Sequence, residues 1–417
     1  MMHEKVLNRI FLISFIYLVP LFDSITGLLV RGDSIQAGGI GSPSQLIRLY
    51  IITLSIFIIR SNVNYIYITL GSCYLLFIEI VSFCFHKDVS GLLYGLVFSY
   101  KFFYSIFIYL ALKKIFNESN YSFSDVLKFI RNFLFFLCII ILVGNILAIK
   151  VGISSSIFRS KGLFPSGNGL GLLLGVLSLI MRLGANEKIL NSFTDKIVYF
   201  LTLVCLVLVA TKASVIFLIL NAAVMFFALH PIARYIGLFV VSIIIAIFWT
   251  NIIYGLNLAF DVIIFRFENK ESWLQFILSG RENYINTAVD TFEKSPWYFP
   301  RFIFGAGSFL SYELPSDFTL SYKMLEMDGV DVFFMYGLIG LIIYVLFFIY
   351  LTIRSFEISR ILGWGAVALF LHSLMAGHTI FNGLSATAIV FILLLKNFHP
   401  KTNKKEYINY ESSISVS

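Results

Sequence analysis

The stretch DVFFMYGLIGLIIYVLFFIYLTI, residues 331–353, decides the fold class of this chain. It is apolar along its length except for one charged residue, Asp331, at its start. About 20 such residues in a helix cross the hydrocarbon core of a bilayer. Eleven further stretches have similar character, at 10–29, 46–60, 64–85, 91–112, 129–149, 167–183, 196–211, 213–229, 235–257, 361–377 and 380–396. The sequence therefore predicts an all-α, polytopic membrane helix bundle of about 12 transmembrane helices.

The composition agrees with a membrane protein. Of the 417 residues, 59% are hydrophobic and 13% are charged, whereas about 25% of residues are charged in soluble domains. The net charge of +8 follows from lysines and arginines near span ends, so it does not indicate nucleic-acid binding. The four cysteines lie in apolar segments without a CxxC pair, and we expect no metal or disulfide.

The positions of lysine and arginine predict the orientation. If the N-terminus is cytoplasmic, every even-numbered connection carries cations, as the positive-inside rule requires. These cations are Lys5, Arg9, Arg60, Lys113, Lys114, Lys128, Arg131, Arg182, Lys188, Lys196, Arg234, Arg354, Arg360 and Lys396. The predicted organisation is then helices 1–9 in 1–258, a large extracytoplasmic loop at 259–330, helices 10–12 in 331–397, and a disordered cytoplasmic tail at 398–417.

Two segments on the opposite side retain cations that export normally disfavours. One carries Arg159 among the glycines Gly162 and Gly167, and the other carries Arg281 in the first turn of a short amphipathic helix. A guanidinium matches phosphate oxygens with two parallel hydrogen bonds. We expect both arginines around one cavity, where they hold a pyrophosphate, with Lys212 adding a third cation. The alternative is that each arginine touches lipid headgroups or forms a salt bridge within the loop.

An acidic segment stands at the mouth of the 331–353 span. Glu326, Asp328 and Asp331 lie on the same predicted side as the two arginines. A carboxylate at such a boundary can act as a general base. Alternatively, Asp328 or Asp331 caps the helix, a role that Glu326 fits less well because it is further from the span.

Other polar residues interrupt the apolar segments. His378, at the outer end of the eleventh span, could position an acceptor hydroxyl, although a packed histidine is the alternative. Asp23, Glu79 and Lys101 lie inside spans, where ionisable groups are costly. An ion pair between Glu79 and Lys101 is the simplest account. A proton or ion path would instead make the protein a transporter.

The sequence lacks the common nucleotide motifs, including a phosphate-binding P-loop and a dinucleotide fingerprint. Any chemistry would therefore use a preactivated, lipid-linked donor.

In these patterns the chain resembles the Wzy-type O-antigen polymerase and O-antigen ligase superfamily, which are GT-C-type integral membrane glycosyltransferases. The resemblance covers the span count, the late extracytoplasmic loop and three local patterns. These are Arg159 with Gly162, Pro165 and Asn168; Arg281 with Ala288, Pro296, Gly305 and Gly307; and Glu326 and Asp328 with Gly337 and Gly340. Many ligases carry a histidine where this chain has its acidic segment, and many relatives have Ser-Arg where this chain has Lys212. Both departures favour a polymerase.

The resemblance implies an O-antigen or capsule repeat-unit polymerase in the bacterial plasma membrane, with its active site on the outer face and both termini in the cytoplasm. Arg159, Arg281 and Lys212 would bind the pyrophosphate of an undecaprenyl-linked oligosaccharide. Glu326 or Asp328 would be the base, and His378 would position the acceptor. Because arginines can replace a cation at a diphosphate, no metal or other cofactor is expected.

The implied partners are the lipid-linked oligosaccharide, membrane lipids, and a chain-length regulator and flippase of the same pathway. Two alternatives remain at this point. One is an O-antigen ligase that transfers the glycan to lipid A-core. The other is a transporter or flippase, which should show inverted repeats and paired broken helices.

Overall fold

The computed structural model describes most of the chain. The described residues are 2–31, 41–59, 65–87, 89–150, 161–247, 249–250, 253–254, 278, 281–293, 297–310, 325–377 and 379–400. Throughout these ranges the regular structure is helical and contains no strand. The predicted all-α class is therefore confirmed.

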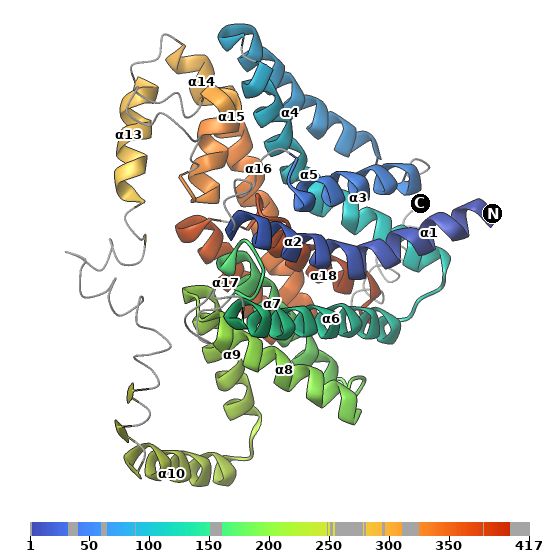
Figure 1. Cartoon of the computed structure of the whole chain (residues 1–417), viewed down its shortest axis with the longest axis vertical. Coiled ribbons are helices and arrows are strands. Elements are labelled where there is room, and N and C mark those ends of the chain that lie inside the picture. The colour runs from blue at the N-terminus through green and yellow to red at the C-terminus, as the bar shows by residue number, and fades with distance from the viewer. Residues whose placement is uncertain are drawn as a thin grey trace, which may run out of the picture.

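Figure 1 shows the helices of the described residues. In chain order they are α1 (Met2–Ile13), the π-helical turn η1 (Ser14–Leu18), α2 (Val19–Arg31), α3 (Pro43–Ile59), α4 (Tyr65–His86), α5 (Val89–Glu118), α6 (Phe123–Lys150), α7 (Gly167–Asn186), α8 (Phe193–Val209), α9 (Lys212–Ala228), α10 (Pro231–Ile247), α13 (Glu282–Glu293), α14 (Tyr298–Phe304), α15 (Gly307–Leu310), α16 (Asp328–Ile358), α17 (Arg360–Ala376) and α18 (Gly383–Phe398). Helix α10 lies away from the main body in Figure 1.

Five runs of helix in the described part of the chain are long and apolar enough to cross a membrane. They are Glu4–Val30, Gly91–Glu118, Phe123–Leu147, Gly167–Asn186 and Asp328–Ile358. Shorter apolar helices accompany them at Pro43–Ile59, Gly71–Phe85, Lys212–Ala228, Arg360–Ala376 and Gly383–Phe398. The protein is thus of the helical membrane type, while the number of twelve spans stays a prediction.

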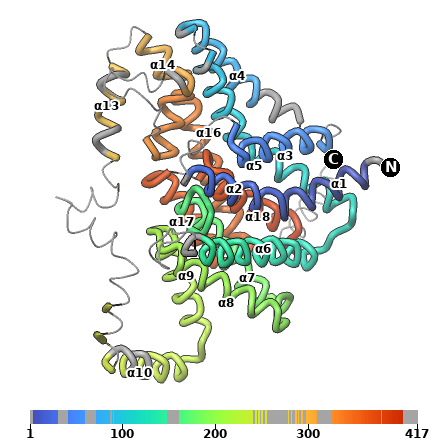
Figure 2. The backbone as a smooth tube through the Cα atoms, viewed as in Figure 1, coloured from blue at the N-terminus to red at the C-terminus, as the bar shows by residue number. Residues whose placement is uncertain are grey.

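Helix α7 forms the centre of the bundle, with α6, α8, α17 and α18 around it (Figure 2). Its residues are buried on every side from Gly169 to Met181. Small residues allow this close packing: a Cβ added at Gly175 would lie 2.2 Å from the ring of Phe217 on α9. Lipid tails are as apolar as the helix side chains, so close packing of this kind is a main source of helix association in a membrane.

Helix α16 is broken near its N-terminal end by residues from the segment that precedes it. Tyr336 and Gly337 have non-helical backbone angles, and the backbone N–H of Ala306 donates to the carbonyl of Phe334, at 3.3 Å. The two glycines Gly305 and Gly337 make this approach possible. A Cβ on Gly305 would lie 2.2 Å from the carbonyl oxygen of Met335, and one on Gly337 would lie 2.3 Å from that of Ile303.

Glu79 of α4 stabilises the same junction, the contact between residues 305–308 and the break in α16. Its carboxylate accepts from the Ser308 hydroxyl at 2.7 Å and backbone N–H at 3.1 Å, and from the Tyr336 hydroxyl at 3.1 Å. The predicted ion pair of Glu79 with Lys101 is therefore wrong. The charge of Lys101 lies 4.3 Å from the centre of the Phe98 ring instead. The sequence could not reveal these partners of Glu79, because they come from residues more than 200 positions away.

We predict that Gly337→Ala destabilises the protein markedly. Its φ of +66° is left-handed, which costs a residue with a Cβ about 1–2 kcal/mol, and the overlap with Ile303 adds to this. Gly237→Ala is the matched control, because a Cβ there meets nothing within 4 Å and alanine favours a helix. Thermal unfolding of the purified proteins in detergent measures both. Equal melting temperatures for Gly337→Ala and wild type would contradict the role given to the junction.

Candidate functional site: an arginine–glutamate pair at the start of α16

The acidic segment folds back on the helix that it precedes. The Asp331 carboxylate accepts from the backbone N–H groups of Leu325 and Met327, at 2.9 and 3.1 Å. These donors would otherwise be unsatisfied at a buried helix start. Asp331 thus stabilises the helix terminus, in line with the capping alternative, although the N-cap residue itself is Met327.

Asp328 connects the start of α16 to the turn between α17 and α18. Its Oδ2 accepts from the Ser373 hydroxyl at 2.7 Å and from the backbone N–H groups of Thr379 and Ile380 at 2.8 and 3.1 Å. The residue is only 1% exposed. A buried carboxylate oxygen that accepts three hydrogen bonds is typical of a structural role.

Glu326 differs from its acidic neighbours because its side chain is 36% exposed and faces a cation. Its carboxylate accepts from the Arg281 guanidinium at 2.9 Å. The predicted short amphipathic helix is α13, and Arg281 comes directly before it instead of in its first turn; Arg281 is itself buried. The fold therefore joins the loop arginine and the acidic segment, two of the three patterns singled out in the sequence.

The Arg281 guanidinium retains hydrogen-bonding capacity. One nitrogen, Nη2, donates to Glu326, and Nη1 donates to the carbonyl of Leu278 at 3.3 Å. Its Nε is buried and has no partner among the described residues. A buried N–H without an acceptor is costly, so this donor is suited to an incoming anion.

The first arginine segment approaches the same end of the bundle, although Arg159 itself lies outside the described residues. Its glycine, Gly162, has a left-handed φ of +56° and packs on the Ile141 carbonyl of α6. The following residues pack against α2, because a Cβ on Gly27 would lie 1.9 Å from the Leu163 carbonyl oxygen. Ser166 then caps α7 by accepting from the backbone N–H of Gly169.

Lys212 lies beside this segment. It is the first residue of α9, directly after the N-cap residue Thr211, and a Cβ on Gly167 would lie 3.2 Å from the Thr211 methyl group. The positive end of the α9 dipole makes this an unfavourable place for a cation. A lysine at this position is consistent with a role for its charge.

The turn before α18 connects the two halves of the site. His378 lies outside the described residues. Its neighbour Gly377 packs on the Glu326 backbone, since a Cβ there would lie 2.3 Å from the Glu326 carbonyl oxygen. At the other end of the turn, Asn382 caps α18 and packs against Gly169 of α7. The acidic segment and the start of α7 are thus linked through residues 377–382.

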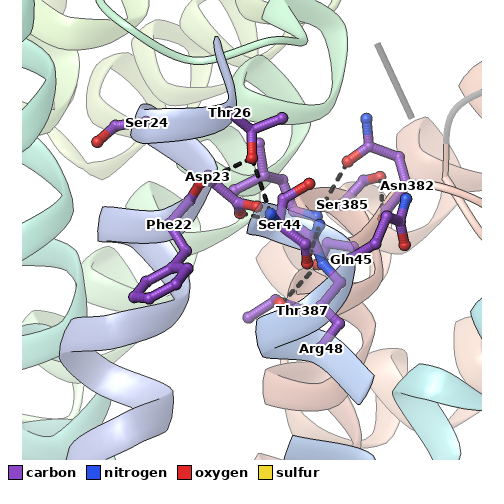
Figure 3. Close-up of polar contacts among 12 residues, drawn as sticks. Phe22, Asp23, Ser24, Thr26, Ser44, Gln45, Arg48, Asn382, Ser385 and Thr387 are labelled. Atoms are coloured by element: carbon purple, nitrogen blue, oxygen red, sulfur yellow. Dashed lines mark hydrogen bonds and ion pairs between the residues drawn. The ribbon is translucent and has the colours of Figure 1, made fainter. Parts of the chain in front are cut away.

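A second polar cluster lies between α2, α3 and α18 (Figure 3), and the sequence analysis named only one residue of its ion pair. Asp23 of α2 was singled out in the sequence, but its partner Arg48 of α3 was not. The Arg48 guanidinium donates to the Asp23 carboxylate at 2.7 Å, and both residues are buried. The sequence could have indicated Arg48 as well, because this charged residue lies two residues inside the predicted span 46–60.

Comparisons of the chain with protein-family models, with curated proteins and with solved structures found no match.

We predict that Asp328→Ala strongly destabilises the protein, whereas Glu326→Gln does not. Removing the Asp328 carboxylate leaves buried backbone N–H groups of Thr379 and Ile380 without acceptors, at about 1–3 kcal/mol each. Glu326 is partly exposed, so water can take the place of a lost contact. Asp328→Asn, which keeps one carbonyl oxygen, should fall between the two. Thermal unfolding in detergent ranks the three variants, and an unchanged melting temperature for Asp328→Ala would refute the structural role.

Proposed function

We propose that this protein is a glycosyltransferase that polymerises O-antigen or capsule repeat units at the outer face of the bacterial plasma membrane. The donor is the growing glycan on undecaprenyl pyrophosphate, and the acceptor is the next lipid-linked repeat unit. The direct contact between Arg281 and Glu326 carries the proposal. It brings a phosphate-binding cation and a partly exposed carboxylate together at the end of an apolar helix.

The reaction requires two kinds of help from the protein. The bond between the sugar and the pyrophosphate oxygen breaks, and negative charge develops on the leaving group. The Nε of Arg281, which has no described partner, is suited to bind that oxygen, because preorganised donors stabilise developing charge. Arg159 and Lys212 complete the pyrophosphate site in this proposal.

Glu326 supplies the second kind of help as the general base. It takes the proton of the acceptor hydroxyl as the oxygen attacks the sugar carbon. When the pyrophosphate binds Arg281, the Glu326 carboxylate loses part of its pairing with the guanidinium and becomes available to the acceptor hydroxyl. We assign the base to Glu326 and not to Asp328, because Asp328 is buried and already accepts three hydrogen bonds. His378 positions the acceptor.

The glycolipids of a deletion strain test the function itself. A polymerase mutant accumulates single repeat units on the carrier, and the plasmid-borne gene restores the polymer. Long polymer stranded on the carrier would indicate the ligase reaction instead. Unaltered glycolipids would refute both, and the transporter alternative would then be examined with flux measurements in proteoliposomes.

We predict that Glu326→Gln loses about 10²–10⁴ in polymerisation rate, the usual contribution of a general base, while the lipid donor still binds. Arg281→Lys should lose donor binding as well as rate, because lysine cannot offer a fork to phosphate. Purified variants mixed with lipid-linked repeat units give both quantities.

The same helix supplies the matched control. Arg354 and Glu357 form an ion pair of the same length, 2.9 Å, near the opposite end of α16. Arg354→Lys and Glu357→Gln make the same chemical changes away from the site and should keep wild-type rates. Full polymerisation by Glu326→Gln would eliminate Glu326 as the base.

A further inference from the structure

The cluster around Arg48 has an excess of positive charge inside the helix bundle. Asp23 lies seven residues before Val30, the last residue of its apolar helix, which corresponds to about 10 Å at 1.5 Å per residue. Arg48 lies five residues after Pro43, where α3 begins. Figure 3 shows both with Ser44, with Asn382, the N-cap residue of α18, and with Ser385 and Thr387 of that helix. These groups therefore lie between helices and not in a surface loop.

The Asp23–Arg48 pair leaves polar atoms unused on both sides. Arg48 donates one bond to Asp23 and one to the backbone carbonyl of Ser44, at 3.2 Å. Its Nε and the Oδ1 of Asp23 are buried without a partner among the described residues. A buried ion pair is stable only when its remaining donors and acceptors are satisfied. The hydrogen bonding of the Asp23–Arg48 pair is therefore incomplete.

Lys101 of α5 adds a second cation. Helix α5 packs on both α3 and α18, and the Tyr104 ring, one turn further along α5, lies 5.8 Å from the Arg48 guanidinium. The Lys101 ammonium lies over the Phe98 ring and forms no ion pair with a carboxylate of the described residues. Glu79, the carboxylate of neighbouring α4, accepts hydrogen bonds from Ser308 and Tyr336 instead.

The charges thus do not balance: two cations, Arg48 and Lys101, lie among apolar helices with one carboxylate, Asp23, which pairs with Arg48. Uncompensated charge in a membrane is costly, and ionisable groups kept there usually serve a function. An anion would balance the charge and provide an acceptor for the unused donors. The amide nitrogen of Asn382 is a further donor at this end of α18, since its amide oxygen already accepts from the backbone N–H of Leu384.

We propose that Arg48 and Lys101 form a phosphate-binding site within the bundle, separate from the Arg281–Glu326 pair, for a lipid that carries a phosphate or diphosphate group. A guanidinium and an ammonium are the usual protein ligands of phosphate. The surrounding rings of Phe98 and Phe381, which lie 5.7 Å apart between centroids, suit the apolar chain of such a lipid. If the polymerase function holds, the site binds the carrier of one of the two glycans; phosphate binding itself does not depend on that reaction.

Calorimetric titration of the purified protein with farnesyl diphosphate tests the site. The titrations are carried out in an Arg281→Gln background, so that the proposed catalytic site contributes little. We expect Lys101→Met to weaken binding about tenfold or more, because one charge-assisted contact is lost, and Lys101→Arg to retain it. Lys114→Gln, a change of a half-buried lysine further along α5 that donates to the Ile58 carbonyl, is the control and should bind like the parent.

Further titrations identify the source of the phosphate. Farnesol, which lacks phosphate, should not bind. Inorganic pyrophosphate binding as tightly as farnesyl diphosphate would indicate a free anion at the same site, and competition by phosphatidylglycerol would indicate a phospholipid headgroup. Equal affinity of Lys101→Met and its parent, or no binding by any phosphate compound, would overturn the proposal.

Arg48 is tested as a pair with Asp23, because Arg48→Gln alone would leave the buried Asp23 carboxylate without its partner. The double variant Asp23→Asn, Arg48→Gln removes both charges, and we expect it to fold and to lose farnesyl diphosphate binding. Failure of the polymerase proposal is visible separately, in the glycolipids of the deletion strain, whatever the titrations give.

Discussion

One carboxylate oxygen, the Oδ2 of Asp328, holds together the part of the molecule on which the candidate site depends. By accepting from Ser373 of α17 and from the backbone of Thr379 and Ile380, it fixes the start of α16 against the turn that leads into α18. Glu326, two residues earlier, is positioned by the same contact. Because the oxygen is buried, water could not replace a lost donor, and each lost hydrogen bond would lower the stability of the protein.

The buried carboxylates and the buried cations of this bundle differ in how fully they are paired. Asp328, Asp331 and Glu79 are all buried, and each accepts hydrogen bonds from hydroxyl or backbone donors. For Asp328 and Glu79 these donors come from distant parts of the chain. Arg48, by contrast, has only the Asp23 carboxylate as its counter-charge, and Lys101 forms no ion pair with a carboxylate of the described residues. In a low-dielectric interior a group must be matched by its neighbours or by a ligand. The matched carboxylates therefore act as structural joints, and the unmatched cations indicate where a ligand binds.

The loop that carries Arg281 is tied to the bundle by backbone contacts as much as by side chains. Residues 305–308 insert at the break in α16, where Gly305 and Gly337 allow two backbones to touch and Glu79 binds Ser308. This explains why the Gly-x-Gly and Gly-x-x-Gly patterns occur in two separate segments: they form two sides of one contact.

The sequence by itself determined the helical membrane class, the amphipathic helix after Arg281 and the presence of an acidic segment beside an apolar helix, because hydropathy and helical period are local properties of the chain. It could not distinguish the roles of Glu326, Asp328 and Asp331, which are close in sequence and similar in chemistry. Only the tertiary structure decided that Asp331 and Asp328 are occupied by donors, that Glu326 faces Arg281, and that Glu79 binds Ser308 and not Lys101. The physical reason is that the partners of Asp328, Glu326 and Glu79 lie between 45 and 229 positions away from these carboxylates, and only packing of the helices brings them together. The donors to Asp331 lie four and six positions away, and the sequence did not show that they point at this carboxylate.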